Sequence, residues 1–424
     1  MGFIKNLDTL AKTPQRKIVL QLVEEALASI QAPTVLAKNF IRNENLLTIS
    51  DQEFDLASYD RVFVVGFGKG SAGVCKIVEK TLEDKITGGF VIDNVEESFT
   101  KLEFSLGTHP LPSQQNIDFT KKVLDNMTNL GEKDLVIVVI CGGGSAMFEA
   151  PHSVTLETLT GVSKALLASG ATISEMNVIR KHLSRVKGGG FAKHLFPARI
   201  VSLLFSDVPG NDMSVIASGP TVKDTTTMDD VKSILSKFSI GEEVIKPTDF
   251  QDTVTDDKYF QNVCNFIMVS NMTALSAMQK KASALGLRPR IYSDHFQADA
   301  KAAGEQLIKE VQDGETLLVG GETTVKVKGH GKGGRNQTLV LAALPFVGDK
   351  TIICSFDSDG MDMYHFAGAL GDKQTRETAQ KLGLDEKTYL DDDNSYAFFE
   401  KVGDGIFTDK LESNVSDLII VFKG

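Results

Sequence analysis

The fold class of this chain follows from the stretch 61-RVFVVGFGKGSAG-73. An apolar run over residues 61–65 leads directly into a segment with glycine at 66, 68, 70 and 73. This order is typical of a strand that passes through a tight turn into a helix. Other short apolar runs also end in Gly, Asp or Ser and alternate with longer segments of helical period. The alternation predicts an α/β fold built from βαβ units around a parallel sheet.

Working outward from this stretch, the same pattern predicts six further strands. They are expected over residues 89–93, 134–140, 199–205, 316–319, 351–355 and 417–422. Near the N-terminus, Thr13 followed by Pro14 predicts a helix N-cap with proline at the first helical position. The helix is expected to run to about Ser29 and to cover the sheet.

Chain length and a change in composition predict two domains. The chain has 424 residues, more than one ordinary hydrophobic core contains. Residues 223–258 are polar and charged, with few periodic apolar positions. We therefore expect an N-terminal domain over residues 1–240 and a smaller α/β C-terminal domain over 241–424, with return of the last strand to the first domain as an alternative.

Composition and charge limit the partners. Lys and Arg total 45 against 56 Asp and Glu, a formal net charge of −11, which argues against nucleic-acid and anionic-membrane surfaces. The four cysteines form no CxxC pair and are interpreted as reduced thiols. The first ten residues carry charges where a signal peptide needs an apolar core. We expect a cytoplasmic monomer or homodimer that binds a small-molecule substrate, with neither nucleic acid nor membrane as a partner.

The first candidate binding loop surrounds Lys69, between Gly68 and Gly70. A glycine turn that opens a helix presents backbone N–H groups and the helix dipole to an anion, and Lys69 adds a full positive charge. Residues 68–73 also match GxGxxG, and Asp93 lies about twenty residues further on. A Rossmann dinucleotide site is therefore an alternative, as is a glycine turn that only permits close helix–strand packing.

The second candidate loop is a run of three glycines and a serine after the apolar strand 134–140. Such a loop wraps an oxyanion with successive N–H groups, and the serine hydroxyl adds a donor. Its position after a strand also favours binding, because ligands of open α/β sheets lie at the carboxyl ends of the strands. The predicted binding residues are Gly142, Gly143, Gly144 and Ser145.

The third candidate region is a cationic segment in this acidic chain. Helical spacing places Arg180 and Lys187 on one face, and Lys181 and Arg185 on another, so that the two stripes could clamp phosphate or carboxylate. A solvated charged surface is the alternative. Asp207 follows the predicted strand 199–205 and is a candidate general base or metal ligand, with turn capping as its alternative.

The fourth candidate region lies in the C-terminal half, where three polar segments follow apolar runs. Glu322 follows one run, and Arg335 and Asn336 emerge from a glycine-rich turn, where the Arg335 guanidinium would meet a phosphate. Asp359 and Asp362 resemble a Mg²⁺ site, because Mg²⁺ takes one or two carboxylates and shares phosphate oxygens. An Asp-Gly turn with capping carboxylates is the alternative for Asp362.

Taken together, the motifs resemble the glycerate 2-kinase family, the MOFRL-type or class II glycerate kinases, over nearly the whole chain. The matching segments are 108-THPLP-112, 142-GGGS-145, 180-RKHLSRVKGG-189, 206-SDVPG-210, 216-IASGPTV-222, 320-GGETTV-325 and 333-GGRNQ-337, with the Gly68–Lys69 loop. One departure, 363-MYHF-366, stands beside the predicted metal carboxylates.

The resemblance implies ATP-dependent phosphorylation of glycerate at the 2-hydroxyl. It also implies a Rossmann-like first domain, a smaller MOFRL-type second domain, and an active site in the cleft between them. Lys69, Asp207, Arg335 and Asp359 occupy positions that the family treats as active-site residues, and His109 stands in a matching segment as a binding residue.

The resulting hypothesis assigns a role to each group. Lys69 and Arg335 neutralise the transferring phosphoryl group, Asp207 accepts the hydroxyl proton, and Asp359, with Asp362 beside it, holds Mg²⁺. An exchange of roles between Asp207 and Asp359 is the alternative. The predicted cofactors are ATP and Mg²⁺. A kinase of a related sugar acid and an NAD(P)-dependent hydroxypyruvate or hydroxy-acid reductase remain the alternatives.

Overall fold

The computed structural model describes residues 2–424 and separates them into two compact units. The first unit comprises residues 35–206 and 211–268, and the second comprises the chain up to Thr34, residues 207–210, and Val269 onward. Contacts thus divide the chain after Met268, whereas the sequence places a boundary at residue 240. The polar segment behind that prediction contains an amphipathic helix, α10 (Met228–Lys237), whose apolar side chains are buried within the first unit.

The first unit is built on a six-stranded sheet. Strands β6, β5, β4, β7 and β8 pair in parallel in that order, and β9 follows at the edge. Numbered along the chain, the order is 3-2-1-4-5-6, that of a Rossmann fold, which confirms the predicted fold class. The strands are β4 (Arg61–Phe67), β5 (Gly88–Asp93), β6 (Glu103–Leu106), β7 (Asp134–Ile140), β8 (Arg199–Phe205) and β9 (Val263–Val269).

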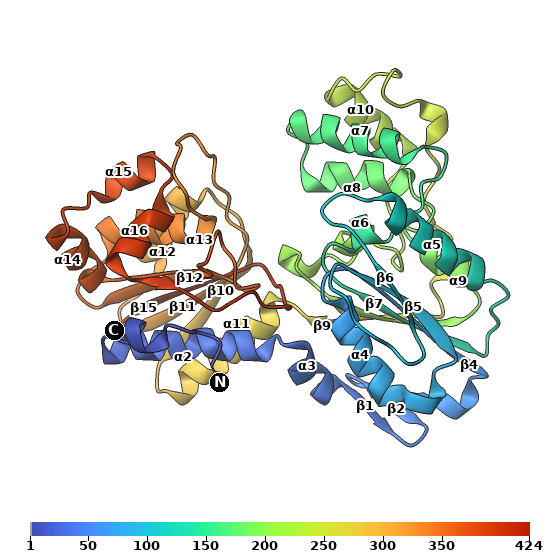
Figure 1. Cartoon of the computed structure of the whole chain (residues 1–424), viewed down its shortest axis with the longest axis horizontal. Helices are drawn as coiled ribbons and strands as arrows, with labels where there is room; N and C mark the ends of the chain where they lie inside the picture. The colour runs from blue at the N-terminus through green and yellow to red at the C-terminus, as the bar shows by residue number, and fades with distance from the viewer. Residues whose placement is uncertain (1) are drawn as a thin grey trace. The chain divides into compact units, whose positions relative to one another are not determined.

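Helices and a small second sheet complete the first unit (Figure 1). Helices α7, α8 and α10 share an apolar cluster of their own, apart from the main sheet. A three-stranded antiparallel sheet, β1-β2-β3, was not predicted from the sequence. The helices are α4 (Ser71–Leu82), α5 (Gln114–Asn126), α6 (Gly144–Met147), α7 (Leu156–Ala168), α8 (Ile173–His182) and α9 (Gly190–Leu195), and the short strands are β1 (Phe40–Asn43), β2 (Leu46–Ile49) and β3 (Gln52–Asp55).

The second unit has a mixed sheet in the order β10-β11-β15-β12-β13-β14. The last strand, β15 (Asp417–Lys423), pairs antiparallel with β11 (Glu315–Gly321) and β12 (Thr351–Asp357), so it lies in the middle of this sheet and does not return to the first. Its all-apolar centre suits burial on both faces. The other strands are β10 (Arg288–Phe296), β13 (Gly368–Gly371) and β14 (Gly405–Ile406).

Helix α2 (Pro14–Ser29) has the predicted bounds, and the Thr13 hydroxyl accepts the predicted capping hydrogen bond from the Arg16 N–H. It lies in the second unit, although the sequence assigns it to the first domain. The reason is its packing against α11 (Asn271–Ala284) and β12 (Figure 1), together with the burial of Arg16 among carboxylates of this unit. The unit also contains α1 (Leu7–Leu10), α12 (Ala300–Glu310), α13 (Arg335–Ala343), α14 (Lys373–Lys381), α15 (Glu386–Asp391) and α16 (Ser395–Val402), and α3 (Ala32–Asn39) follows α2 across the division at Thr34.

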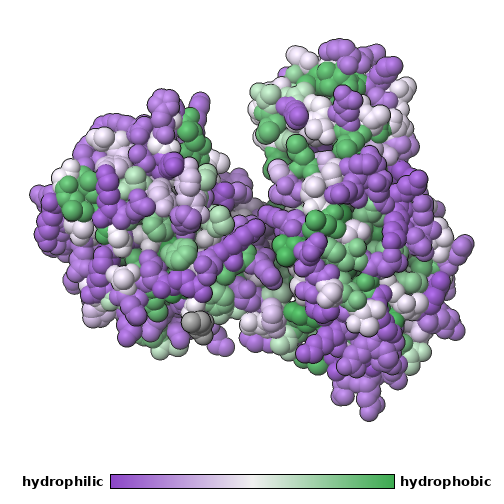
Figure 2. All heavy atoms as spheres, viewed as in Figure 1, coloured by the Kyte–Doolittle hydropathy of each residue, from purple (hydrophilic) through white to green (hydrophobic). Residues whose placement is uncertain are grey.

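The surface carries charged and polar groups over most of the face drawn in Figure 2, with hydrophobic residues scattered between them. Among residues 2–424, no helix is both long enough and apolar enough to cross a membrane.

Candidate active site

The two predicted glycine loops of the first unit lie against each other at the carboxyl ends of β4 and β7. The Lys69 N–H donates a 2.8 Å hydrogen bond to the Gly142 carbonyl. Gly68 has φ +107°, and a Cβ there would lie 2.4 Å from the Cys141 carbonyl oxygen, so only glycine permits this approach. The strand order of the sheet reverses between β4 and β7, which is where open α/β sheets bind their ligands.

The first turn of α4 is less open to an anion than the sequence predicts. The Asp93 carboxylate accepts a hydrogen bond from the Ala72 N–H at 2.9 Å, and the Ser71 hydroxyl donates to the Ile92 carbonyl. Asp93 is 1% exposed, and burial raises the pKa of its carboxyl group. Because this carboxylate is buried and bound to α4, it is not presented to a ribose, as a dinucleotide site requires.

Lys69 and His109 lie close together beside the second glycine loop. A Cβ on Gly143 would lie 2.7 Å from the His109 ring, so the ring packs directly on this glycine. Burial lowers the pKa of His109, and the Lys69 ammonium lowers it further. Both effects favour the neutral form of the His109 ring, and the influence of Lys69 shows that the two side chains lie near each other.

A cavity of about 290 Å³ opens next to this pair. Its walls come from the His109 segment, the second glycine loop, α7 and α8, and Arg180 is the residue from α8. The volume suits a small organic acid. The lining residues with polar side chains are His109, Ser145, Glu149, Ser163 and Arg180.

Glu149, at the wall of this cavity, forms a buried ion pair with Lys187. Lys187 is 2% exposed and donates to Glu149 Oε2, whereas Glu149 Oε1 is buried and has no hydrogen-bond partner among residues 2–424. Burial lowers the pKa of Lys187, and the Glu149 carboxylate opposes that shift. Burial likewise lowers the pKa of Arg180, again opposed by Glu149. Glu149 thus compensates two buried cations, a role that the sequence analysis missed.

The predicted helical stripes of basic residues are wrong, because α8 ends at His182. Lys187 lies beyond the helix and is buried with Glu149, and Arg185 is exposed. Lys181 is paired with Asp224 at 2.8 Å. Of the basic residues in this segment, Arg180 is the one that lines the cavity.

A chain of hydrogen bonds, also missed from the sequence, supports the second loop. The Ser145 and Ser218 hydroxyl oxygens lie 2.9 Å apart, and Ser218 donates to Asn177 Oδ1 at 3.0 Å. Ser218 belongs to a matching family segment, 216–222, which was the available signal. The contacts fix the orientation of the Ser145 side chain at the cavity wall.

In the second unit, Arg335 stands at the start of α13 and is surrounded by carboxylates. Its guanidinium lies 2.9 Å from Glu322, 3.0 Å from Asp357 and 2.8 Å from Asp417. Burial alone lowers the pKa of Arg335, but the carboxylates outweigh it and the pKa is raised. These residues gather where the central strands β11 and β12 end and β15 begins.

The carboxylates around Arg335 include two that the sequence analysis did not select, Asp357 and Asp417. Burial raises the pKa of Asp357, and the charges of Asp417 and Asp359 raise it further. Burial also raises the pKa of Asp417, although Arg335 opposes it. Asp357 follows the predicted strand 351–355 and stands two residues before Asp359, and Asp417 begins the predicted strand 417–422, so their positions beside apolar runs were the available signals.

Comparison with known proteins relates both units to one family. A family model described as a domain of unknown function, DUF4147, matches residues 18–249, and the MOFRL family model matches residues 315–417. The D-glycerate 2-kinase of Thermotoga maritima is 36% identical over 85% of this chain and 90% of its own length. The chain belongs to the glycerate 2-kinase family. The glycerate 2-kinase of Pyrococcus horikoshii is 32% identical, with 96% of each chain covered.

Solved structures agree with this assignment. The crystal structure of the Thermotoga maritima glycerate kinase has a TM-score of 0.85 and 31% identity, covering 96% of this chain and 99% of that one.

Another relative, from Agrobacterium vitis, bears the name putative hydroxypyruvate reductase and is 34% identical over 86% of this chain and all of its own length. The family therefore carries two activity names.

The predicted metal residues of this family member differ in their surroundings. Both Asp362 oxygens accept backbone hydrogen bonds at the start of α13, from the N–H groups of Asn336 at 3.0 Å and Gln337 at 2.9 Å. Burial raises the pKa of Asp362 to about 6. This geometry is that of a helix cap. Asp359 is half-buried; its carboxylate accepts a 2.9 Å hydrogen bond from the Met361 N–H, and its backbone carbonyl accepts one from the Leu411 N–H at 2.7 Å.

Within the described part of the chain, no group of three or more His, Cys, Asp or Glu side chains has the arrangement of a metal site. A Mg²⁺ ion that also takes phosphate oxygens needs only one or two protein carboxylates. The mutual repulsion of Asp357 and Asp359 fits such an ion better than the capped Asp362 does.

Asp207 follows β8 and is grouped with the second unit. The Ser416 hydroxyl donates a 2.6 Å hydrogen bond to the Asp207 carbonyl oxygen. Ser416 directly precedes Asp417, the first residue of β15 and an ion-pair partner of Arg335. The hydrogen bond therefore holds the Asp207 backbone near the start of β15.

The segment that departs from the family pattern, 363–366, forms a tight turn next to Asp362. The Asp362 N–H donates to the Phe366 carbonyl at 2.9 Å, and Met363 and Phe366 form an isolated bridge. The Tyr364 and Phe366 rings pack on Tyr396 of α16, with centroids 5.2 and 5.1 Å apart. The altered residues thus serve packing within the second unit.

Proposed function

We propose that this chain transfers the γ-phosphoryl group of ATP to the 2-hydroxyl of glycerate. The observation that carries the proposal is the geometry of the first unit: a lysine and two glycine loops meet at the reversal of strand order in a chain that belongs to the glycerate 2-kinase family. The names of relatives from Thermotoga maritima and Pyrococcus horikoshii support the substrate and the position of phosphorylation.

In this proposal the cavity beside His109 receives glycerate. Arg180 pairs with the carboxylate of the acid, because Glu149 forms its ion pair with Lys187 and acts on Arg180 only through its charge, which leaves the guanidinium donors to the ligand. The neutral His109 ring and the Ser145 hydroxyl position the hydroxyl groups of the acid. Fixed polar groups of this kind contribute by orientation, which is a large part of phosphoryl-transfer catalysis.

Lys69 and Asp207 are assigned to the transfer itself. As the 2-hydroxyl oxygen bonds to the γ-phosphorus, the bond from phosphorus to the leaving ADP oxygen breaks, and Asp207 accepts the hydroxyl proton. The Lys69 ammonium stabilises the charge on the phosphoryl oxygens. The loop N–H groups that remain unpaired orient the same oxygens.

Arg335 is assigned to the transferring phosphoryl group beside Lys69, and Asp359 to Mg²⁺, the roles that the sequence suggests. Asp359 and Asp357 are the carboxylates that would hold Mg²⁺, which would neutralise negative charge on the phosphates. Arg335 is held by three carboxylates, so its fork is fixed in position before a phosphate arrives. Asp362 orders the start of α13 beneath it.

A nicotinamide-dependent hydroxypyruvate reductase is the second candidate, favoured by the name of the Agrobacterium vitis relative and by the GxGxxG loop. The surroundings of Asp93 weigh against it. A dinucleotide site uses an acidic residue at this position to bind the ribose, and here the carboxylate is buried against α4.

Two assays on the same preparation separate these candidates. The first measures ADP release from Mg-ATP with glycerate, threonate and gluconate, which also tests the related sugar acids. The second measures oxidation of NADH and NADPH with hydroxypyruvate. The proposal predicts ADP release that requires glycerate and no nicotinamide oxidation. Nicotinamide oxidation without ADP release would replace the kinase with the reductase.

A further inference from the structure

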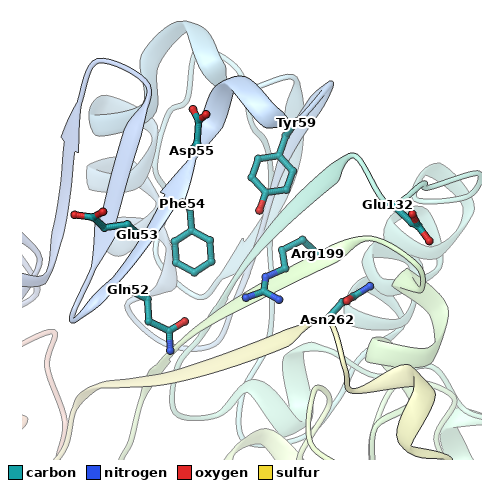
Figure 3. A pocket seen from close by; sticks show the side chains of 8 residues that line it. All are labelled: Gln52, Glu53, Phe54, Asp55, Tyr59, Glu132, Arg199 and Asn262. Atoms are coloured by element: carbon teal, nitrogen blue, oxygen red, sulfur yellow. The ribbon is translucent and has the colours of Figure 1, made fainter.

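We propose that the first unit has a second binding site, for a small monocarboxylate, centred on Arg199. A cavity of about 480 Å³ lies in this unit, and Gln52, Phe54, Tyr59, Arg199 and Asn262 are among its lining residues (Figure 3). This volume is within the range of cavities that hold small organic ligands. The site is independent of the proposed kinase reaction.

The cavity lies at the amino ends of the strands, whereas the glycine loops lie at the carboxyl ends. Arg199 is the first residue of β8, Asn262 directly precedes β9, and Tyr59 stands two residues before β4. The glycine loops follow the other ends of β4 and β7. A parallel strand of seven residues spans roughly 20 Å, so a ligand at Arg199 would not touch the proposed reaction site.

The Arg199 guanidinium has no acidic partner. Among the ion pairs of residues 2–424 none involves Arg199, although three acidic residues line the same cavity. Its contacts are a 3.0 Å hydrogen bond to the Cys264 sulfur and a cation–π contact with Phe54, 5.7 Å from the ring centroid. These contacts hold the guanidinium in place and leave most of its N–H donors for a ligand.

Polar groups converge on the guanidinium and would complete an oxyanion site. In Figure 3 the Tyr59 hydroxyl points toward Arg199, with the Asn262 amide on the other side and the Phe54 ring beside it. A phenol donates to carboxylate oxygens, and the Asn262 amide, which donates one N–H to the Pro197 carbonyl at 3.1 Å, keeps its second N–H for a ligand. The guanidinium fork matches a carboxylate with two parallel hydrogen bonds. The Phe54 ring provides an apolar wall for the carbon body of the ligand.

The rim of the cavity determines the charge of the ligand. Glu53, Asp55 and Glu132 are exposed, and in Figure 3 their carboxylates point away from Arg199. Three negative charges around one positive charge repel polyanions such as nucleotides, and phosphate carries up to two charges near neutral pH. A monocarboxylate balances Arg199 without adding a second charge to this rim.

Cys264 provides a direct readout of occupancy. It is half-buried beside Arg199, whereas Cys75, Cys141 and Cys354 are buried. The experiment measures the rate of alkylation of the full-length protein by iodoacetamide at pH 8, with increasing propionate and with sodium chloride at matched ionic strength. A Cys264→Ser variant gives the background from the other thiols.

The proposal predicts that saturating propionate slows alkylation of Cys264 at least fivefold and that chloride does not. In Arg199→Gln the half-protecting concentration of propionate rises at least about tenfold, the loss expected for a charge-assisted contact. Tyr59→Phe raises the half-protecting concentration of propionate by a smaller factor. It replaces Arg199→Gln in the test if thermal melting shows that Arg199→Gln does not fold. Protection is scored as a ratio within each variant, because the Arg199 contact also affects the thiol itself.

Each remaining outcome overturns the proposal. Absence of protection in the unaltered protein, or equal protection in both variants, removes the site. Protection by inorganic phosphate at lower concentration than propionate contradicts the monocarboxylate class. Competition by glycerate that disappears in an Arg180→Gln variant would place the propionate effect in the other cavity.

Discussion

Lys69 is the single side chain on which the proposed phosphoryl transfer depends most. If its ammonium stabilises the transferring phosphoryl group, Lys69→Ala lowers kcat about 10²- to 10³-fold, the loss seen when one charge-stabilising group is removed, with a smaller change in the KM for glycerate. Steady-state ADP release measures both constants. Lys80→Ala is the control, because Lys80 is exposed at the far end of the same helix. An unchanged kcat in Lys69→Ala would exclude the role.

Asp362 gives a pH-dependent prediction. Burial raises the pKa of its carboxyl group from 3.8 to about 6, so the folded protein binds this proton more tightly than the unfolded chain does. The stabilisation is present below about pH 4 and is lost as the pH rises through 6. We therefore expect the unaltered protein, measured against Asp362→Asn, to have a free energy of unfolding about 2 kcal/mol higher at pH 4.5 than at pH 8.

The contrast for Asp362 is Asp385, which caps α15. The Asp385 side chain is held by Thr388, and these hydrogen bonds lower the pKa of its carboxyl group. Its stabilisation is therefore present at higher pH and is lost as the pH falls. Urea denaturation of Asp362→Asn and Asp385→Asn at pH 4.5 and pH 8 tests the signs. A stability of the unaltered protein relative to Asp362→Asn that increases with rising pH would contradict the assignment.

The close packing of the two glycine loops is a property of the elements that they connect. Gly68→Ala forces a side chain into a left-handed conformation and against the Cys141 carbonyl, 2.4 Å away. We expect the variant to lose at least about tenfold in kcat and about 1–3 kcal/mol of stability. Gly161→Ala is the matched control: its Cβ meets nothing within 4 Å on α7, so it should stabilise the helix by about 0.5–1 kcal/mol. Full activity in Gly68→Ala would contradict the claim that catalysis requires close packing of the two loops.

The attachment of α2 rests on a buried ion network. Arg16 is fully buried and lies 2.6 Å from Asp372 and 2.7 Å from Asp404. Arg16→Met leaves the buried Asp372 without its cation and Asp404 with Lys12 alone, 2.7 Å away, which costs about 3 kcal/mol. Thermal and urea unfolding measure the loss, and Lys17→Met, on the exposed side of the helix, should change stability by less than about 0.5 kcal/mol. Equal stability of both variants would contradict this account.

Elements with strong local signals were predicted well from the sequence. The strands after which the glycine loops begin and helix α2, with its Thr13 cap and Pro14, were placed within a few residues. Short strands such as β1, β2 and β3 were missed, because four-residue strands carry little periodicity. The basic stripes on α8 failed for a related reason: no local signal in 180–187 revealed that the helix stops at His182.

At the scale of the whole molecule, long-range pairing limited what the sequence could predict. The fold class, the family and the proximity of Lys69 to the second glycine loop were accessible, because strand–loop–helix order determines where parallel strands end. The partners of the charged residues were not. Glu149 with Lys187, and Asp357 and Asp417 with Arg335, are neighbours only in space, and nothing in the local sequence identifies them. The grouping of α2 with the second sheet has the same cause, since Arg16 finds its partners more than 350 residues away.

The most direct test of the central claim is the identity of the product. The full-length protein is incubated with Mg-ATP and D-glycerate, and the mixture is followed by ³¹P NMR with 2-phosphoglycerate and 3-phosphoglycerate as standards. The account predicts that 2-phosphoglycerate appears in step with ADP and that Lys69→Ala suppresses both. Formation of 3-phosphoglycerate, or no phosphorylated acid while hydroxypyruvate is reduced, would contradict it.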